Sequence, residues 1–317
     1  MSFDLGIRPY QPGDEKFILD LFEQSYGHAL GDKVWAWRFR DNPAGPGVID
    51  LIWDGNILAA HYAVTAVKLQ INGQDWLTGL SGTTMTHPNY RGRGLFPVLA
   101  RKTYSRMAEM GMAMVWGFPN TLSHRGFIRD LNWRDIYEIP KFQLPLDAKI
   151  KFQTVRDYIF ELSAFDERFN RLWERVKSSY SIISRRDYVH LQWRYIQNPS
   201  ERYRILAFVQ KEDVLGYVVF KRYQDEFQVI DILTTEIQAG EELILQVVRI
   251  ACEESARSVG LWLNVTHPLH HALEKIGFRN TEPVTYFGGL RLHPELGGAE
   301  LFDFREWYLT MGDSDVF

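Results

Sequence analysis

This 317-residue sequence contains a single cysteine, Cys252. A disulfide framework or a cysteine-based metal site within one chain is therefore excluded. Basic residues are not in excess either: the formal net charge is -4, so no global positive field attracts nucleic acid or an anionic membrane. No apolar run reaches about 18 residues, and residues 1–4 do not lead from a basic start into an apolar segment. We therefore expect a cytoplasmic protein with no membrane span, no metal and no nucleic-acid partner.

What the sequence does contain is an ordinary globular composition, 45% hydrophobic and 24% charged, over a length that suits two domains. A short segment occurs twice in similar form, because residues 37–43 (Trp-Arg-Phe-Arg-Asp-Asn-Pro) resemble residues 193–199 (Trp-Arg-Tyr-Ile-Gln-Asn-Pro). Three further pairs follow in the same order: residues 60–62 with 216–218, Gly111 and Pro119 with Gly260 and Pro268, and residues 131–133 with 276–278. This ordered series indicates an internal duplication.

Apolar periodicity predicts the same succession in each copy, with strands, then a helix, a strand, a helix and a last strand. An Asn72-Gly73 turn indicates that the first two strands of the first copy are antiparallel neighbours. A helix is predicted to begin at Gly13-Asp14. Strands are predicted over 57–71, 76–86 and 112–116, and helices over 95–110 and 121–131.

These elements predict an α/β fold with a mixed α+β sheet, arranged as two tandem domains. The expected domains are 1–145 and 146–290, and the prolines in residues 140–146 suggest that this segment is the linker. Residues 291–317 are expected to form a tail that packs on the domains.

Residues 87–96, His-Pro-Asn-Tyr-Arg-Gly-Arg-Gly-Leu-Phe, join a predicted strand to a predicted helix. Glycines at 92 and 94 allow backbone conformations closed to other residues and bring N–H groups close to a ligand. The first N–H groups of the following helix have no internal partner, so the loop suits an anion such as a pyrophosphate. Charge agrees with this, because no Asp or Glu lies between Asp75 and Glu109. The same interval holds Arg91, Arg93, Arg101, Lys102 and Arg106.

Two other phosphate-binding motifs do not fit this segment. The G-x-x-x-x-G-K-[ST] spacing of a Walker loop is absent. The G-x-G-x-x-G spacing is absent as well, and no acidic residue follows where a ribose would need one. On these residues alone, an ordinary strand-to-helix turn without a ligand remains an alternative.

The segment resembles the coenzyme A pyrophosphate loop, Arg/Gln-x-x-Gly-x-Gly/Ala, of the GCN5-related N-acetyltransferase (GNAT) superfamily. Residues 91–95 fit this pattern, whereas Phe96 replaces its last small residue. Residues 131–133 and 276–278, Leu-Asn-Trp and Ile-Gly-Phe, resemble the Leu-Gly-Phe that closes the family's domain. The tandem arrangement resembles acetyltransferases of the enhanced-intracellular-survival type. The resemblance implies that the first domain binds coenzyme A as acetyl-CoA or another acyl-CoA.

In that superfamily the strand before the loop splays from the next strand, and the pantetheine arm of coenzyme A pairs with backbone groups in the gap. An unpaired strand edge offers N–H donors to the arm and to the thioester oxygen. Carried over, Met85 and Thr86 contact the arm, Arg91, Gly92, Arg93, Gly94, Leu95 and Phe96 hold the pyrophosphate, and Asn120 and Ser123 line the gap.

The second copy lacks such a loop. Its corresponding segment, residues 231–242, has no Arg-Gly-x-Gly and carries Asp231, Glu236, Glu241 and Glu242. Since carboxylates repel a polyanion, we expect the second domain to be degenerate and to act as a structural partner.

The groups that the superfamily often uses for proton transfer are also missing. The position of its tyrosine is occupied by Ile128 in the first copy and Leu273 in the second, and residues 76–86 contain no carboxylate. His124, at the start of the helix after the gap, is the candidate base, because histidine titrates near neutral pH.

Two carboxylates of the tail, Asp313 and Asp315, are further catalytic candidates, since they could fold back to bind an amine. His61 lies in an apolar strand and is interpreted as a core histidine, and His87 as a loop residue.

The resemblance therefore implies an N-acyltransferase that moves an acyl group, expected to be acetyl, directly to a small-molecule or sugar amine. A covalent intermediate is not expected, because Cys252 lies in the other copy. One alternative is a non-catalytic acyl-CoA-binding or scaffold module, favoured by the missing tyrosine and glutamate. Another is an aminoacyl transferase that uses charged tRNA, against which the acidic net charge counts.

Overall fold

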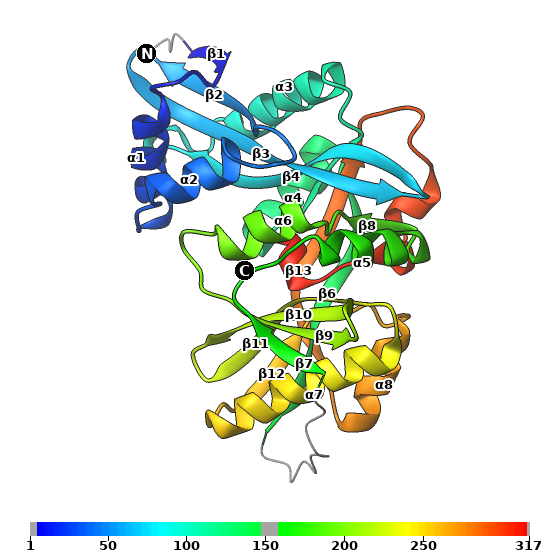
Figure 1. Cartoon of the computed structure of the whole chain (residues 1–317). Helices are drawn as coiled ribbons and strands as arrows, with labels where there is room; N and C mark the ends of the chain where they lie inside the picture. Colours follow the sequence, from blue (N-terminus) through cyan, green and yellow to red (C-terminus); the bar gives the residue numbers. More distant parts are fainter. Residues whose placement is uncertain (1–4, 147–157, 316–317) are drawn as a thin grey trace. The chain divides into compact units, whose positions relative to one another are not determined.

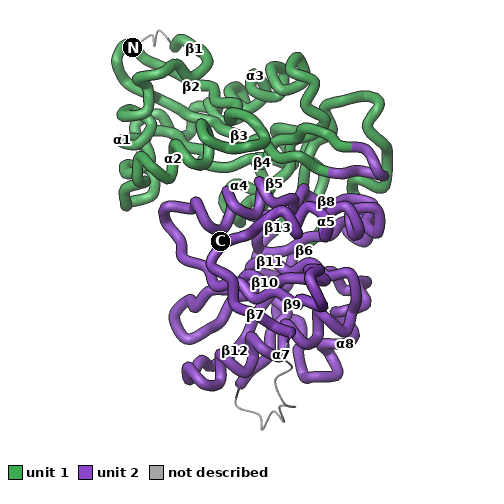
Figure 2. The backbone as a smooth tube through the Cα atoms, viewed as in Figure 1, with its two compact units in different colours: residues 1–69, 75–137, 286–302 green, residues 70–74, 138–285, 303–317 purple. Residues whose placement is uncertain are grey.

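The structure, a computed structural model, describes residues 5–146 and 158–315 and has a mixed α/β fold, as the sequence predicts (Figure 1). The chain divides into two compact units (Figure 2). Unit 1 comprises residues 1–69, 75–137 and 286–302, and unit 2 comprises residues 70–74, 138–285 and 303–317. In the part of the chain that the structure describes, no helix is long and apolar enough to cross a membrane.

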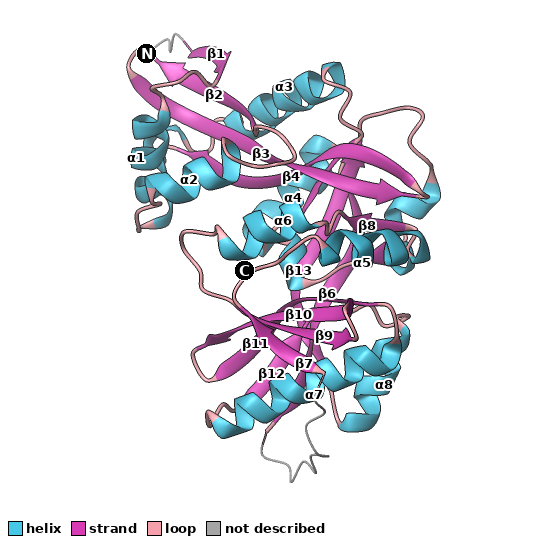
Figure 3. Ribbon diagram, in the orientation of Figure 1, coloured by secondary structure: helices cyan, strands magenta, loops and turns pink. Residues whose placement is uncertain are grey.

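Unit 1 is a sheet with helices packed on it (Figure 3). Its strand order is β1-β2-β3-β4-β5, followed by the end of β13. The pairs β1–β2, β2–β3 and β5–β13 are antiparallel, and β4–β5 is parallel. Its elements are β1 (Leu5–Pro9), α1 (Glu15–Tyr26), α2 (Asp32–Phe39), β2 (Val48–Asp54), β3 (Ile57–Ile71), β4 (Gln74–Thr86), the short 3-10 turn η1 (Pro88–Tyr90), α3 (Leu95–Glu109), β5 (Met114–Gly117), α4 (Thr121–Leu131), the start of β6 (Arg134–Pro145) and the end of β13 (Arg279–Arg291).

The sheet strands of unit 2 run in the order β7-β9-β10-β11-β12-β6. The helix α7 packs on it through an apolar face that includes Leu243, Val247 and Ala251. The elements are β7 (Ile159–Leu162), α5 (Arg168–Val176), β8 (Ile182–Ser184), α6 (Tyr188–Leu191), which continues into the π-helical turn η3 (Gln192–Ile196), β9 (Arg204–Gln210), β10 (Asp213–Tyr223), β11 (Glu226–Thr234), α7 (Ile237–Glu253), β12 (Ser258–Leu261), α8 (Pro268–Ile276), β14 (Trp307–Tyr308) and the 3-10 turn η6 (Met311–Asp313).

Most predicted elements of the first copy are confirmed. The strands predicted over 57–71 and 76–86 are β3 and β4, and they meet at Asn72 and Gly73, whose φ values of 50° and 83° suit a tight hairpin. The predicted helices are α3 and α4. The buried face of α3, which includes Leu95, Leu99 and Met107, recurs at helical spacing and packs against the sheet of unit 1.

The predicted linker is wrong. Residues 140–145 continue β6, and residues 142–145 pair with residues 258–261 of β12. The prolines misled the prediction, because Pro145 is the last residue of the strand, where proline is tolerated. The predicted domains 1–145 and 146–290 and the tail 291–317 stay a prediction.

The two halves of the chain show the same element order. From β1 to β6 the order is β-α-α-β-β-β-α-β-α-β, and the same order runs from β7 to β13 once the short strand β8 is set aside. The last strand of each half pairs with the other half's strands: β6 lies beside β12, and residues 288–291 of β13 lie beside residues 114–117 of β5. In each unit a distant segment of the sequence therefore adds a strand to those of the other half.

Candidate functional site

The loop before α3 has the geometry of an anion site. Gly92 and Gly94 have φ values of 75° and 72°, a left-handed conformation that favours glycine. Gly94 is the N-cap of α3, and no side chain caps the helix. A Cβ placed on either glycine meets no atom within 4 Å. The first N–H groups of α3 thus begin beside open space, where the helix dipole favours negative charge.

The two arginines of the loop are exposed, and backbone contacts hold them there. Arg91 Nε donates to the Thr86 carbonyl at 3.3 Å, and Arg93 Nη2 donates to the Asn89 carbonyl at 2.8 Å. The guanidinium of Arg93 also lies 5.0 Å from the ring centre of Tyr90. Both cations therefore remain beside the glycines.

Two of the cations farther along α3 bond other residues of unit 1. Arg106 pairs with the buried carboxylate of Asp50 at 2.6 Å. Arg101 Nη2 donates to the Asp130 carbonyl at 2.6 Å. Arg106 is therefore neutralised by Asp50, whereas Arg101 and Lys102 remain exposed cations on α3.

Phe96, the departure from the family pattern, is accommodated by α4. Its ring packs at 5.1 Å from the ring of Phe127 and at 6.0 Å from that of Tyr62. A Cβ on Gly126 would lie 3.1 Å from the Phe96 ring, so the missing side chain of that glycine gives the ring its space. The bulky residue is therefore directed onto α4, beside the loop.

The end of β4 extends past the end of β5. Their ladder consists of Gly79 opposite Val115 and Leu80 opposite Trp116, and β5 ends at Gly117 while β4 runs to Thr86. The side chain of Met85 is 2% exposed and belongs to the core beneath α1 and α2. A ligand at this strand edge would therefore meet the backbone of Met85.

Asn120 and Ser123 form the N-terminal cap of α4. Asn120 Oδ1 accepts from the backbone N–H groups of Leu122 and Ser123 at 3.1 and 3.0 Å, and Ser123 Oγ donates to the same oxygen at 3.1 Å. The cap fixes where α4 starts after β5.

His124, one turn into α4, is held on two sides. Its Nε2 lies 2.7 Å from Asp135 Oδ1, and its ring stacks on Tyr286 with centroids 3.8 Å apart and planes 7° apart. Asp135 is in β6 and Tyr286 is in β13. Sequence reasoning missed both partners, since neither stands in a motif and Tyr286 comes from the other copy.

His87 lies in a loop and His61 in the core, as the sequence predicts. His87 Nδ1 accepts from the Asn89 N–H at 3.2 Å and caps η1. His61 is fully buried, and its Nδ1 lies 2.8 Å from the Thr83 carbonyl. Burial lowers the pKa of His61 to about 4.

Asp313 lies in a buried network of unit 2. Its carboxylate accepts from Arg186 Nη2 at 2.7 Å, from the Thr310 N–H at 2.8 Å and from the Ser184 hydroxyl. Because these donors occupy both oxygens, the geometry favours a structural role for Asp313. Asp315, next to it in the tail, is exposed.

In unit 2 the tail lies along the part of β11 that extends past β12. The β11–β12 ladder ends at Val229 opposite Leu261. Farther along β11, Thr310 Oγ1 bonds Asp231 at 3.0 Å, and the Tyr308 hydroxyl donates to the Ile232 carbonyl. β11 and β12 hold the places in the element order that β4 and β5 hold in unit 1.

One of the four carboxylates in the corresponding segment of the second copy is neutralised inside unit 2. Asp231 is 1% exposed and pairs with Arg186 at 3.1 Å, so it does not present a free negative charge. The strand edge itself is occupied by the tail.

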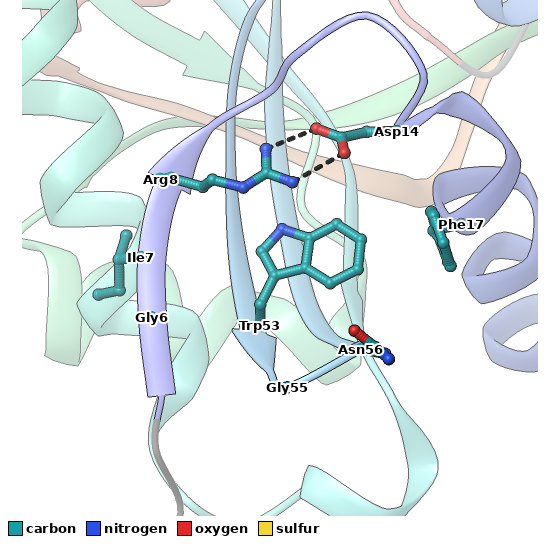
Figure 4. A pocket seen from close by; sticks show the side chains of 8 residues that line it. All are labelled: Gly6, Ile7, Arg8, Asp14, Phe17, Trp53, Gly55 and Asn56. Carbon is teal, nitrogen blue, oxygen red and sulfur yellow. Dashed lines mark hydrogen bonds and ion pairs between the residues drawn. The ribbon is translucent and has the colours of Figure 1, made fainter.

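A pocket of about 440 Å³ lies elsewhere in unit 1, between β1, the β2–β3 turn and the start of α1 (Figure 4). Arg8 lies 4.9 Å from the ring centre of Trp53, and both of its terminal nitrogens bond Asp14, at 2.7 and 2.8 Å. Its charge is thus already neutralised, and none of the predicted cofactor residues lines the pocket. Within residues 5–146 and 158–315 no cluster of His, Cys, Asp and Glu is arranged to hold a metal ion.

Comparison with known proteins identifies the fold of this site. Residues 6–136 match the family model described as an acetyltransferase (GNAT) domain. The matched residues contain the loop, the end of β4 and His124, so the candidate site lies in the part of the chain that resembles a GNAT domain. No curated protein matches the chain in sequence.

Solved structures share this fold over nearly the whole chain. A probable N-acyltransferase of unknown function from Enterococcus faecalis is 12% identical with a TM-score of 0.73, covering 92% of this chain and 73% of its own. A GCN5-related N-acetyltransferase from Anabaena variabilis is 15% identical with a TM-score of 0.72, covering 91% and 73%. The N-myristoyltransferase of Saccharomyces cerevisiae, solved with bound myristoyl-CoA, is 11% identical with a TM-score of 0.60, covering 92% and 83%. At these identities the likeness concerns the fold.

Proposed function

We propose that the chain is an acyl-CoA-dependent N-acyltransferase whose coenzyme A site lies in unit 1. One observation carries the proposal: the loop before α3 presents two left-handed glycines and a helix start without a side-chain cap, inside the part of the chain that resembles a GNAT domain. A Cβ would fill the open space beside Gly92 and Gly94, which fits a pyrophosphate that approaches the backbone closely. Arg91 and Arg93 would add charge-assisted hydrogen bonds.

The acyl-bearing arm is proposed to lie against the end of β4, where that strand continues past β5. Backbone N–H groups there would bind the arm and stabilise the oxyanion that forms from the thioester carbonyl. Asn120 and Ser123 would border the arm from the start of α4. Acetyl is the acyl group that we propose, and a small-molecule or sugar amine is the acceptor.

The reaction is a direct transfer. The neutral amine attacks the thioester carbon, a C–N bond forms and the C–S bond breaks, so that coenzyme A leaves as a thiolate that takes up a proton. His124 is proposed to accept the proton that the amine loses. Its contact with Asp135 through Nε2 orients the ring and leaves Nδ1 to act as the base. Asp315 is kept as the second candidate.

Release of free thiol from acetyl-CoA in the presence of a panel of amines and amino sugars tests this function. We expect turnover with at least one acceptor class. His124→Ala should lower kcat by roughly 100-fold while leaving the KM for acetyl-CoA nearly unchanged. His271→Ala, at a histidine that is 72% exposed on α8, serves as the control and should behave like the wild type.

The other outcomes point to the alternatives. Coenzyme A binding by calorimetry without thiol release from any acceptor would indicate a non-catalytic acyl-CoA-binding module. Transfer that requires charged tRNA would indicate an aminoacyl transferase. Normal turnover of His124→Ala would remove the assignment of the base and leave the site in place.

A further inference from the structure

Strand β4 contains an unusual backbone conformation close to the proposed thioester. Thr83 has a φ of 56°, in the left-handed region, although it is β-branched and lies inside a strand. Such a residue rarely adopts this conformation, and it persists only where the surroundings impose it. This left-handed turn of the backbone at Thr83 comes after the last β4–β5 pair, so pairing with β5 does not impose it.

His61 on β3 supplies a specific contact to this turn. Its Nδ1 lies 2.8 Å from the Thr83 carbonyl oxygen, and a carbonyl can only accept, so Nδ1 carries the proton. Nε2 therefore carries no proton and can only accept a hydrogen bond. It is buried and has no hydrogen-bond partner among the residues that the structure describes. Since burial lowers the pKa of His61 to about 4, the ring is neutral near pH 7 and keeps this tautomer.

The next carbonyl of β4 is also held by a side chain. The Tyr26 hydroxyl, at the end of α1, donates to the Thr84 carbonyl at 3.0 Å. Two consecutive peptide groups at the end of β4 are thus held by side chains of β3 and α1.

We propose that His61 is a positioning residue: by donating to Thr83, it fixes the left-handed turn of β4 and thereby sets the orientation of the backbone N–H groups that meet the acyl thioester. The inference rests on the proposed function, because it assigns the end of β4 to the thioester. It also replaces the interpretation of His61 as a core residue alone, which would require only its volume.

Two variants of similar shape separate these roles. His61→Asn keeps a donor close to the position of Nδ1, whereas His61→Leu fills a similar volume without one. We expect His61→Asn to keep kcat within about threefold of the wild type and His61→Leu to lower kcat by roughly 10- to 100-fold, somewhat less than the loss of an oxyanion donor. The affinity for coenzyme A, measured by calorimetry, should stay within about twofold in both, because the loop is untouched. Equal kcat in the two variants would overturn the proposal.

A second measurement does not depend on turnover. Hydrogen exchange of the peptide that covers residues 82–86 should be at least about tenfold faster in His61→Leu than in His61→Asn, since the released turn opens more often. If wild-type protein transfers no acyl group, the proposed function fails, and the exchange result still decides the role of His61. If His61→Leu does not fold, His61→Gln is used instead. The side-chain amide of glutamine lies near the position of Nε2 and does not reach the Thr83 carbonyl. Hydrogen exchange of residues 82–86 that is as slow in His61→Gln as in His61→Asn would then contradict the inference.

Discussion

Replacing Gly94 by valine provides the sharpest test of the coenzyme A loop, because α3 carries its own control. Gly94 precedes the helix with a φ of 72°, and Gly111 follows it with a φ of 74°. A Cβ at either position meets no atom within 4 Å. Valine should therefore strain the backbone equally at both ends, by about 1–2 kcal/mol for the left-handed conformation. Both variants should fold with similarly lowered melting temperatures.

Coenzyme A affinity should separate the two variants. At Gly94 the valine side chain occupies the space beside the first N–H groups of α3, where the pyrophosphate is proposed to lie. Losing one hydrogen bond to a charged group costs about 1.5–3 kcal/mol, so the Kd should rise by roughly 10- to 150-fold. Gly111→Val should leave the Kd within about twofold, because it lies at the far end of the helix.

Isothermal titration with coenzyme A measures both affinities, and thermal unfolding confirms that the strain is matched. If Gly94→Val binds coenzyme A as tightly as Gly111→Val does, the loop is not the pyrophosphate site, and the central argument for the proposed function fails.

Three further outcomes are expected. Coenzyme A should saturate at one equivalent per chain, because the tail occupies the corresponding edge of β11, and saturation at two would contradict this. Asp313→Asn should lower the free energy of unfolding by about 3 kcal/mol, because it removes a charge from the buried Arg186 pair. Asp41→Asn, at the exposed pair with Arg40, should leave the melting temperature nearly unchanged. Burial lowers the pKa of His61 and of His190 to about 4, below the value of histidine in the unfolded chain. The free energy of unfolding should therefore be at its full value above pH 6.5 and fall as the pH drops toward 4. Denaturant midpoints that stay constant across this range would refute this expectation.

Local pattern was enough to predict the elements around the site. The spacing of Leu95, Leu99 and Met107 predicts α3, and Asn72-Gly73 predicts the hairpin, because each signal lies within one turn or one strand. The loop from Arg91 to Gly94 was predictable for the same reason.

Contacts between distant segments were not predictable. Nothing near Asp135 or Tyr286 in the sequence indicates that they meet His124, since one lies in β6 and the other in β13. The left-handed Thr83 has no local signal either, because threonine does not favour that conformation and a buried histidine on another strand contacts its carbonyl. The prolines of β6 likewise suggested a linker, because strand pairing depends on a partner far along the chain.

The late arrival of β13 has a consequence for how the chain folds during synthesis. Residues 114–117 of β5 leave the ribosome long before residues 288–291, which pair with them. Until then, one side of β5 is an open edge that can pair with another chain, so aggregation competes most strongly during this interval. Such long-range pairing also slows folding. A fragment cut after the first copy would keep this edge open permanently, and for that reason the smallest useful expression unit of this protein must extend at least through β13.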